Sequence, residues 1–419
     1  MELYRAKIEN IIKKSLPFFF VLVFLTTITG SWLGYLEHNS WKMGDWLINY
    51  QGGMIRRGLL GEIIFQLAHF THINPGIYVV IFQIFFYAVF FLISYFLLKK
   101  QHALLPFALL IFSPFIFCFQ INDLQGGYRK EIIYFALLAL IVWSTTIKES
   151  KKFEKIFFTI LFFYPLVILT HEMLAIFLPY LLAAFILSAK LNKKKNILIC
   201  VLLLPSIIVF FVASHFSGTE IQVSTIFTSI ANENYKVSGG SISWLSKDAA
   251  YATSKVSEAI TIRHFNHYIF VTPLALIAYI PVYYDLKRLF KNKPVLWLLN
   301  ASIFGTIGLM LYAMDWGRFL YIHLVSIFLL LLLPAIQIHN IRQKPPNVIK
   351  KSTVVLFIVY ILFWHIPHAG YFGKTYEKRY KTVNYISFLE PYKKIIKLYN
   401  KKNKKNISII NRDNICLLI

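Results

Sequence analysis

Hydrophobic residues in this chain gather in long continuous runs that short polar segments separate. Several runs approach or exceed the about 20 apolar residues that a helix needs to cross a bilayer, whereas a transmembrane barrel shows alternating segments of about 10 residues. The pattern therefore predicts an all-α, polytopic transmembrane helical bundle with about 11 spans. The predicted spans lie near 16–36, 76–98, 103–120, 132–147, 156–170, 173–189, 197–214, 268–284, 294–313, 319–338 and 352–366.

Lysine and arginine residues between the runs predict the orientation of the chain. Cytoplasmic loops carry an excess of these residues, and the basic start of the chain places the N-terminus in the cytoplasm. The loops alternate cleanly only if the apolar segment 58–73 does not cross, so we interpret 58–73 as an interfacial or re-entrant helix that follows the first outside loop. The basic clusters that then face the cytoplasm are Lys99 and Lys100, Lys148 to Lys155, Lys190 to Lys195, Lys287 to Lys293, and Arg342 to Lys351.

This topology divides the chain into a single transmembrane domain, 1–368, and a basic C-terminal tail, 369–419. Its outside loops are 37–57, 121–131 and the large loop 215–267 in the second half of the chain, where we expect one or two short amphipathic helices, for example over 244–262. With 11 spans the tail lies outside despite its lysines. Long tails obey the charge rule weakly, so the predicted number of spans holds to within one.

Composition supports a membrane protein: 57% of the residues are hydrophobic, 17% are aromatic, and the mean hydropathy is +0.59. The net charge of +25 comes without a nucleic-acid recognition motif, so we assign it to orientation and to anionic lipid. The N-terminal apolar run lacks a cleavage site and is expected to be a retained span. The three cysteines have no metal-binding spacing, and the chain has no P-loop and no dinucleotide fingerprint. We therefore predict no metal and no cofactor.

Four predicted outside connections place acids close to cations or a histidine. One such group is usually an interface anchor or an internal ion pair, but four at the same membrane face favour a functional site. They are Asp45, Gln51, Arg56, Arg57 and Glu62; Asp123, Gln125 and Arg129; His171 and Glu172; and Asp315 and Arg318.

The first two connections share a Gln-Gly-Gly pattern followed by basic residues, at 51–57 and 125–130. Paired glycines let backbone N–H groups approach a ligand, and arginines supply forked donors that match phosphate oxygens. The glycines are also typical of simple turns. Because Arg56 and Arg57 lie outside, against the orientation rule, they predict an anionic group such as a lipid-linked phosphate or diphosphate. A nearby acid would then act as general base on a sugar hydroxyl.

A basic chain of about 11 spans, with arginine-rich outside loops and a long outside loop in its second half, resembles the Wzy-type polymerases of O-antigen or capsule repeat units. Those are inner-membrane glycosyltransferases related to the GT-C class. Asp45, an acid in the first outside loop, also looks like the GT-C pattern, in which that loop carries the catalytic acid. The likeness covers the architecture of the whole chain and includes no diagnostic motif.

The resemblance implies an enzyme of the bacterial inner membrane that joins undecaprenyl-diphosphate-linked oligosaccharide units into surface polysaccharide at the periplasmic face. Its partners would be these substrates, membrane lipids, and chain-length regulator and flippase proteins. Asp45, or Glu172 with His171, would activate the acceptor hydroxyl. The phosphate-binding residues would be Arg56, Arg57, Arg129 and Arg318. The cleft would be shaped by Gln51, Glu62, Asp123, Gln125 and Asp315. The aromatic residues that stack on sugars or anchor the chain at the interface would be Trp41, Trp46, Tyr50, Tyr128 and Trp316.

Three alternatives stay open. The chain could be a GT-C glycosyltransferase that uses a polyprenyl-phosphate sugar, a flippase of lipid-linked oligosaccharides, or a scaffold without enzymatic activity. A flippase is expected to place cations along the middle of its spans. Here the ionisable residues lie at loops and span ends, with His323 among the few exceptions, which disfavours a flippase.

Overall fold

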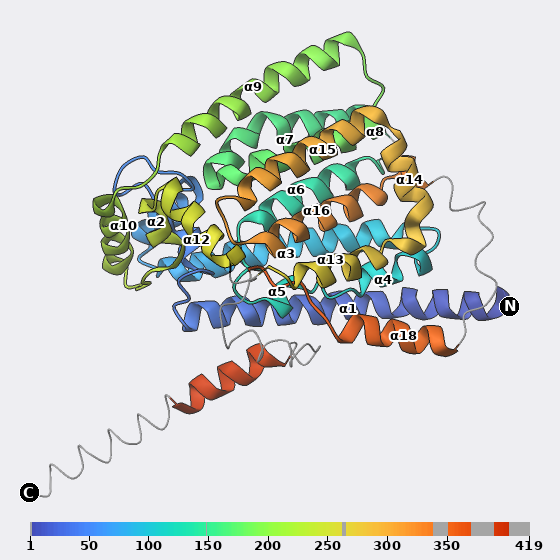
Figure 1. The fold of residues 1–419 in the computed structure, drawn as a ribbon, viewed down its shortest axis with the longest axis horizontal. Helices are drawn as coiled ribbons and strands as arrows, with labels where there is room; N and C mark the ends of the chain where they lie inside the picture. The colour runs from blue at the N-terminus through green and yellow to red at the C-terminus, as the bar shows by residue number, and fades with distance from the viewer. Residues whose placement is uncertain (1, 148, 262–264, 338–350, 370–388, 402–419) are drawn as a thin grey trace, which may run out of the picture.

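The computed structural model describes residues 2–147, 149–261, 265–337, 351–369 and 389–401. These residues form a bundle of helices and contain no β-strand, which confirms the predicted all-α class (Figure 1). Of the predicted basic tail, only residue 369 and residues 389–401 are described. The longest helices are α1 (Glu2–Leu36), α3 (Pro75–Lys99), α7 (Ser150–Thr170), α9 (Lys193–His215) and α15 (Lys293–Met310).

Five helices in the described part of the chain are long and apolar enough to cross a membrane, and they are the five longest helices. A sixth span results if α13 (Tyr268–Ile277) and the pair η5 (Ile280–Val282) and α14 (Tyr283–Lys291) form one element with a bend of 46°. Length and composition therefore support five or six spans. The remaining apolar helices are shorter: α2 (Leu59–Thr71), α6 (Glu131–Ser144), η3 (Glu172–Phe177) with α8 (Leu178–Ser188), α16 (Trp316–Leu331) and α18 (Lys351–Leu362).

Residues 103–120, which the hydropathy predicts as one span, do not form a continuous helix. They form short helical pieces, η2 (Leu105–Phe107) and α4 (Ala108–Ile111), followed by turns that lead into α5 (Phe119–Asn122). Pro106 and Pro114 explain the breaks, because proline lacks the N–H that a helix interior requires. The segment is largely buried inside the bundle, where protein groups satisfy irregular backbone; for example, the Asn122 side-chain amide donates to the Pro114 carbonyl at 2.9 Å.

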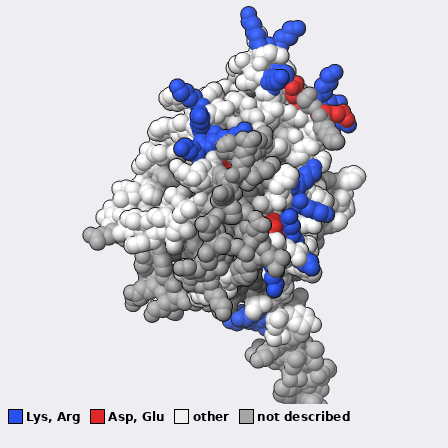
Figure 2. Space-filling model, turned by 90° about the vertical axis from the view of Figure 1, so that its right-hand side faces the viewer, with Lys and Arg blue, Asp and Glu red and all other residues white. Residues whose placement is uncertain are grey.

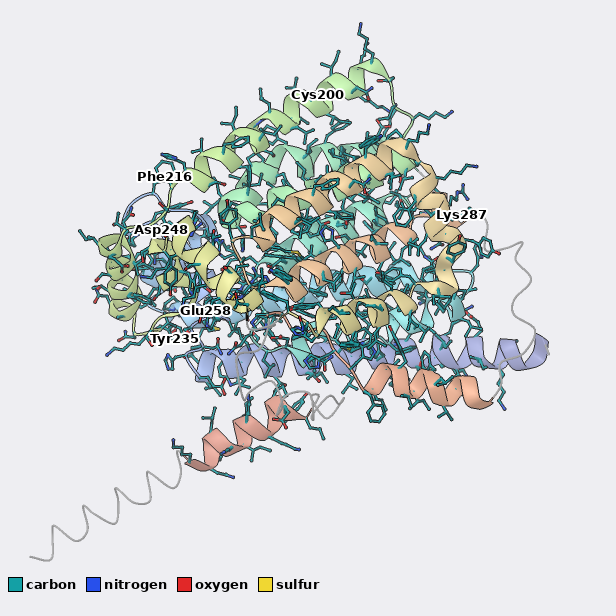
Figure 3. All side chains as sticks on the ribbon, in the orientation of Figure 1. Cys200, Phe216, Tyr235, Asp248, Glu258 and Lys287 are labelled. Atoms are coloured by element: carbon teal, nitrogen blue, oxygen red, sulfur yellow. The ribbon has the colours of Figure 1, made fainter. Side chains whose placement is uncertain are left out.

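Helix α6 is the centre of the bundle. It packs against α3, α7, α8 and α16, and it is apolar around its whole circumference, as a helix buried on all sides must be. By contrast, α9 is strongly apolar yet only 11% of its most hydrophobic window is buried, which suits a helix that faces lipid. Figure 3 shows Cys200 on this outlying helix.

The two ends of the bundle differ in their chemistry. Helices α2, α10 (Glu220–Asn232) and α12 (Ala249–Thr261) lie at one end, and α14 and the N-terminus lie at the other (Figure 1). Lys and Arg side chains gather on the second end with few acids among them (Figure 2), and Lys287 lies there while Asp248 and Glu258 lie at the first end (Figure 3). The basic clusters near 99–100, 151–155, 190–195 and 287–293 thus lie at the end expected to face the cytoplasm, and the cluster at 342–350 lies outside the described residues.

The long loop predicted at 215–267 contains α10, α11 (Gly240–Ser243), η4 (Trp244–Ser246) and α12, so it holds more helix than expected. It folds onto residues 37–57, the predicted first outside loop. The Arg56 N–H donates to the Phe216 carbonyl at 3.1 Å, and the Ser241 N–H donates to the Ser40 carbonyl at 3.3 Å. The segment therefore covers η1 (Gly44–Leu47), the short helix of the first loop.

Gly61→Ala is expected to destabilise the protein, because α2 packs its backbone directly on the first loop. A Cβ at position 61 would lie 1.8 Å from the Ile48 carbonyl oxygen and 2.9 Å from that of Trp46. Overpacking of this kind costs about 1–3 kcal/mol, so thermal unfolding in detergent should occur at a lower temperature. Gly308→Ala on α15 is the control, since a Cβ there meets nothing within 4 Å and alanine favours helix. An unchanged midpoint for Gly61→Ala would contradict this packing.

Candidate functional site

Ionisable side chains from four separate connections lie together in one largely buried group, which we call the charged cluster. Sequence analysis predicted that these connections share one face, and the structure places their side chains in contact or within electrostatic range of one another. The charged cluster consists of Asp45 on η1, Arg57 before α2, Arg129, Lys130 and Glu131 at the start of α6, His171 and Glu172 after α7, and Asp315 and Arg318 at the start of α16.

The strongest contact in the charged cluster joins Arg57 and Glu172. The Arg57 Nε and Nη2 atoms both donate to Glu172 Oε1, at 2.9 and 2.7 Å, and Nε also reaches Oε2 at 3.0 Å. Forked arginine–carboxylate pairs of this kind are stronger and more directional than single hydrogen bonds. This pair therefore joins the segment before α2 to the turn after α7.

A second arginine joins two acids across the start of α6 and the start of α16. Arg318 Nε lies 2.9 Å from Glu131 Oε1 as an ion pair, and Arg318 Nη2 lies 3.2 Å from Asp315 Oδ2. The Asp315 side chain is 26% exposed, whereas those of Arg318 and Glu131 are buried. Asp315 therefore lies at the accessible rim of the charged cluster.

Lys130 connects three of the four connections through backbone groups. Its fully buried Nζ donates to the Arg57 carbonyl at 2.9 Å and to the Thr170 carbonyl at 3.0 Å. Burial lowers the pKa of Lys130 to about 8, although Asp45 opposes the shift. The lysine thus fixes the backbone on either side of the Arg57–Glu172 pair.

Asp45 is the most enclosed acid of the charged cluster, with 1% of its surface exposed. Its Oδ1 lies 3.6 Å from Arg129 Nη1, and neither carboxylate oxygen has a hydrogen-bond partner within the described chain. Burial opposes ionisation, but Arg129 and Lys130 outweigh it and hold the pKa of Asp45 well below its usual range. Asp45 is therefore a fixed negative charge, which makes it a weak base.

His171 is equally enclosed, at 1% exposure, and its Nδ1 lies 3.7 Å from Glu172 Oε2. Burial and the nearby Arg57 lower the pKa of His171 well below its usual range, so the ring is neutral. Two of the three predicted bases are thus shut away from solvent. The third, Glu172, is occupied by Arg57.

The charged cluster is balanced in formal charge. Its four cations, Arg57, Arg129, Lys130 and Arg318, face four carboxylates, Asp45, Glu131, Glu172 and Asp315. An anionic ligand would therefore have to exchange with an internal carboxylate. The side chain best placed for exchange is Arg57, which is 25% exposed.

Arg56, adjacent to Arg57 in sequence, lies within electrostatic range of Glu172 but makes no direct ion pair with the described residues of the charged cluster. Its Nη2 donates to the Trp244 carbonyl at 3.4 Å, toward the loop that covers η1. The divergence has a backbone cause: Arg57 has a φ of +66°, in the left-handed region that turns the chain sharply. The predicted Arg56–Arg57 clamp is thus divided between two surroundings.

Gln51 and Glu62 also lie apart from the charged cluster. Glu62 accepts hydrogen bonds from the Tyr50 N–H at 2.8 Å, from the Gln51 amide at 2.8 Å and from the Gln66 amide at 2.6 Å. These bonds hold the end of the first loop against α2. The pair therefore has a structural role in the geometry described here.

Asp123 pairs with His368, and Gln125 is exposed beside it, donating its backbone N–H to Asp123 Oδ1 at 3.2 Å. One glycine of each similar pattern packs closely against a segment that is distant in sequence. A Cβ at Gly126 would lie 2.2 Å from the His368 Cβ, and a Cβ at Gly52 would lie 2.8 Å from the Gln222 carbonyl oxygen. Close packing of backbone, rather than approach of a ligand, accounts for these glycines.

The aromatic residues predicted to stack on sugars have mixed positions. Trp46 and Tyr128 are fully buried, and the Trp46 Nε1 donates to the Tyr128 carbonyl at 2.8 Å, so they join two loops. Trp316 stacks on Phe265, with ring centroids 3.7 Å apart. Trp41 lies over the Arg129 guanidinium, 5.2 Å from the ring centroid, at the edge of the charged cluster.

Sequence reasoning missed several residues that build this region. Lys130 ends the second Gln-Gly-Gly pattern and Glu131 follows it, yet neither was assigned a role in the site. Ser241, which accepts a hydrogen bond from Arg129, comes from a distant segment without any motif. His368 follows the last predicted span at the same face, and that placement was its only signal.

No group of three or more His, Cys, Asp or Glu side chains among the described residues could hold a metal ion. The chain matches no known family model, no curated protein and no solved structure. The function is therefore argued from the geometry above and from the architectural resemblance.

Proposed function

We propose that this chain is a membrane glycosyltransferase that joins oligosaccharide units carried on undecaprenyl diphosphate, as the Wzy-type polymerases that it resembles do. The observation that carries the proposal is the convergence of four arginine- and acid-bearing connections into the charged cluster, with the lysine-rich connections at the opposite end of the bundle. By the positive-inside rule the charged cluster would face the periplasm. The 11-span topology and the cytoplasmic N-terminus belong to this proposal.

The charged cluster suits a phosphorylated substrate at a membrane surface. Arg57 lies at its rim with a forked set of donors, and Arg129 keeps a buried Nε without a partner among the described residues. Guanidinium groups of this kind match phosphate oxygens and stabilise the charge on a departing diphosphate. A phosphate would bind Arg57 by displacing Glu172, which would leave that carboxylate inside the cleft.

A second glycosyl-transfer reaction, from a polyprenyl-phosphate sugar, would use the same charged cluster. A flippase is less consistent with the interior of the bundle. His323, which lies in α16, is held by the Tyr180 hydroxyl at 2.6 Å and by the Thr306 hydroxyl at 2.8 Å. This ring therefore has a hydroxyl partner at each nitrogen, as a structural histidine does.

Deletion of the gene in its host tests the function directly. The expected result is loss of the ladder of long surface glycans on a gel, with a single repeat unit retained, and return of the ladder when the gene is restored on a plasmid. An unchanged ladder with altered sugar composition would support the decorating transferase instead. Complete loss of the surface glycan would support the flippase, and an unaltered glycan would contradict all three assignments.

A further inference from the structure

We propose that His368, oriented by Asp123, is the general base that removes the proton from the acceptor hydroxyl. This inference rests on the proposed glycosyl transfer and names the group that activates the nucleophile. It replaces Asp45, His171 and Glu172 in that role. It arises from contacts between the second outside loop and the segment that follows α18.

The carboxylate of Asp123 contacts both the ring and the backbone N–H of His368. Its Oδ2 lies 2.6 Å from His368 Nδ1 and accepts the His368 backbone N–H at 2.8 Å. Its Oδ1 accepts the Gly126 N–H at 2.9 Å and the Gln125 N–H at 3.2 Å. Burial opposes ionisation of Asp123, but His368 and these N–H donors hold its pKa well below the usual range. The carboxylate thus stays ionised and keeps a proton on His368 Nδ1.

A proton on Nδ1 leaves the lone pair on Nε2, which is the atom that acts as a base in carboxylate–histidine pairs. His368 Nε2 makes no hydrogen bond within the described chain, and the side chain is 17% exposed. The ring therefore combines a fixed tautomer with an accessible nitrogen. Asp45 and His171 are each 1% exposed, and Glu172 is held by Arg57, so none of them combines these properties.

The position of His368 beside the charged cluster is also fixed. Its carbonyl accepts the Gly317 N–H at 3.1 Å and the Arg318 N–H at 3.3 Å, at the first turn of α16. The ring lies within electrostatic range of Asp315, at the rim of the charged cluster. The preceding Pro367 carbonyl accepts the Tyr268 hydroxyl at 2.9 Å. These contacts place the base beside Arg318, a member of the charged cluster.

Two glycines make room for this segment. A Cβ at Gly126 would lie 2.2 Å from the His368 Cβ, and a Cβ at Gly317 would lie 1.7 Å from the Pro367 carbonyl oxygen. The second outside loop and the start of α16 therefore enclose the His368 backbone closely from two sides. A ring held this closely can receive a proton without a large rearrangement.

The proposed step balances in atoms and charge. The acceptor hydroxyl oxygen attacks the anomeric carbon of the donor glycan, and the bond from that carbon to the diphosphate oxygen breaks. The electron pair leaves with undecaprenyl diphosphate, whose charge Arg57 and Arg129 stabilise. The hydroxyl proton moves to His368 Nε2 and then to solvent. Asp123 stays ionised and stabilises the imidazolium that forms.

The test uses the full-length chain in membranes of the deletion strain, which hold the host's own lipid-linked units. His368→Ala is expected to reduce ladder formation about 100-fold or more, the range of a lost general base. Added imidazole should restore part of the rate, and restoration should rise with pH as imidazole loses its proton. Asp123→Asn should also reduce ladder formation strongly and alter the pH profile, because the amide cannot stabilise the imidazolium and would place an NH2 group against N–H donors. Purified His368→Ala should bind undecaprenyl diphosphate as the wild type does.

His365→Ala, three residues away, is the matched control and should keep the wild-type ladder and pH profile. A wild-type ladder for His368→Ala overturns the inference while the deletion still supports the transferase. Loss of the ladder together with loss of undecaprenyl-diphosphate binding, without rescue by imidazole, shows a purely structural role and also overturns it. If the deletion strain itself makes a normal glycan, the proposed function fails, and the inference fails with it.

Discussion

Arg57→Ala is expected to reduce glycan extension by about 100-fold or more, whereas the adjacent Arg56→Ala should have a much smaller effect. The two side chains differ only in their surroundings. Arg57 pairs with Glu172 at the rim of the charged cluster, while Arg56 points to the Trp244 carbonyl. Removal of a donor that stabilises a departing oxyanion costs about 100- to 1000-fold in rate. The measurement is the density of the glycan ladder in the complemented deletion strain, normalised to the amount of protein in the membrane.

Two further variants separate catalysis from folding. Arg57→Ala leaves the Glu172 carboxylate buried without its partner, so Arg57→Ala with Glu172→Gln should recover thermal stability but no activity. Arg57→Lys keeps the charge but loses the fork, and it should retain a small part of the activity. Equal activity of the Arg56 and Arg57 alanine variants would contradict the assignment. Recovery of activity in the double variant would show that Arg57 serves structure alone.

The convergence of the charged connections was predictable from the sequence because it depends on orientation. Lysine clusters at alternate loops placed the connections that carry Asp45, Arg129, Glu172 and Arg318 at one face, and the structure brings these side chains together. Such a prediction needs only the order of spans and the bias of basic residues. It does not need the span count to be right, since the break of residues 103–120 into short pieces left the connections at the same end.

The partners within the charged cluster were not predictable, because they depend on backbone geometry. Arg57 adopts a positive φ although it is not a glycine, and this turn sends Arg56 elsewhere. The sequence pattern suggested that these glycines form ligand-binding turns. In the structure, segments that are distant in sequence pack against them; His368, for example, packs against Gly126. Likewise, Ser241 reaches Arg129 only because the loop after α10 folds back over η1. Contacts of this long range leave no periodic pattern in a single sequence.

Hydropathy also predicted one continuous span where the structure has a broken segment. Proline residues at 106 and 114 were visible in the predicted third span, but the run of apolar side chains around them outweighed the breaks. An apolar segment buried within protein has the same composition as one that faces lipid. The exposed apolar helix α9 and the enclosed helix α6 show the two cases in one chain.

Lys130→Met is expected to lower both stability and activity severely. The substitution keeps the length of the side chain but removes two hydrogen bonds, to the Arg57 and Thr170 carbonyls, and a positive charge next to Asp45. Loss of one partner from a buried charged group costs about 3–5 kcal/mol. Thermal unfolding in detergent should therefore start at a clearly lower temperature. Since the Arg57 backbone would lose its anchor, glycan extension should also fall.

The dependence of the free energy of unfolding on pH separates the contribution of Lys130 from that of other groups. Burial lowers its pKa from 10.5 to about 8, so between those values the unfolded chain binds a proton that the folded chain has released. The free energy of unfolding of the wild type should consequently rise with pH across that window. In Lys130→Met, the part of this rise that comes from Lys130 should be absent. The part that comes from Lys42 should remain, because burial lowers the pKa of Lys42 to about 7.

Lys42→Met is the matched control, since both lysines are fully buried. Lys42 Nζ donates to the Gly30 carbonyl at 2.7 Å and lies 4.1 Å from the centroid of the Tyr128 ring, outside the charged cluster. Its loss should reduce stability by less than the loss of Lys130, and it should leave Arg57 in place. Equal losses for the two variants would mean that any buried lysine matters alike. A larger loss for Lys130→Met, with a weaker rise of stability above pH 8, would show that the hydrogen bonds of the Lys130 amino group hold the charged cluster together.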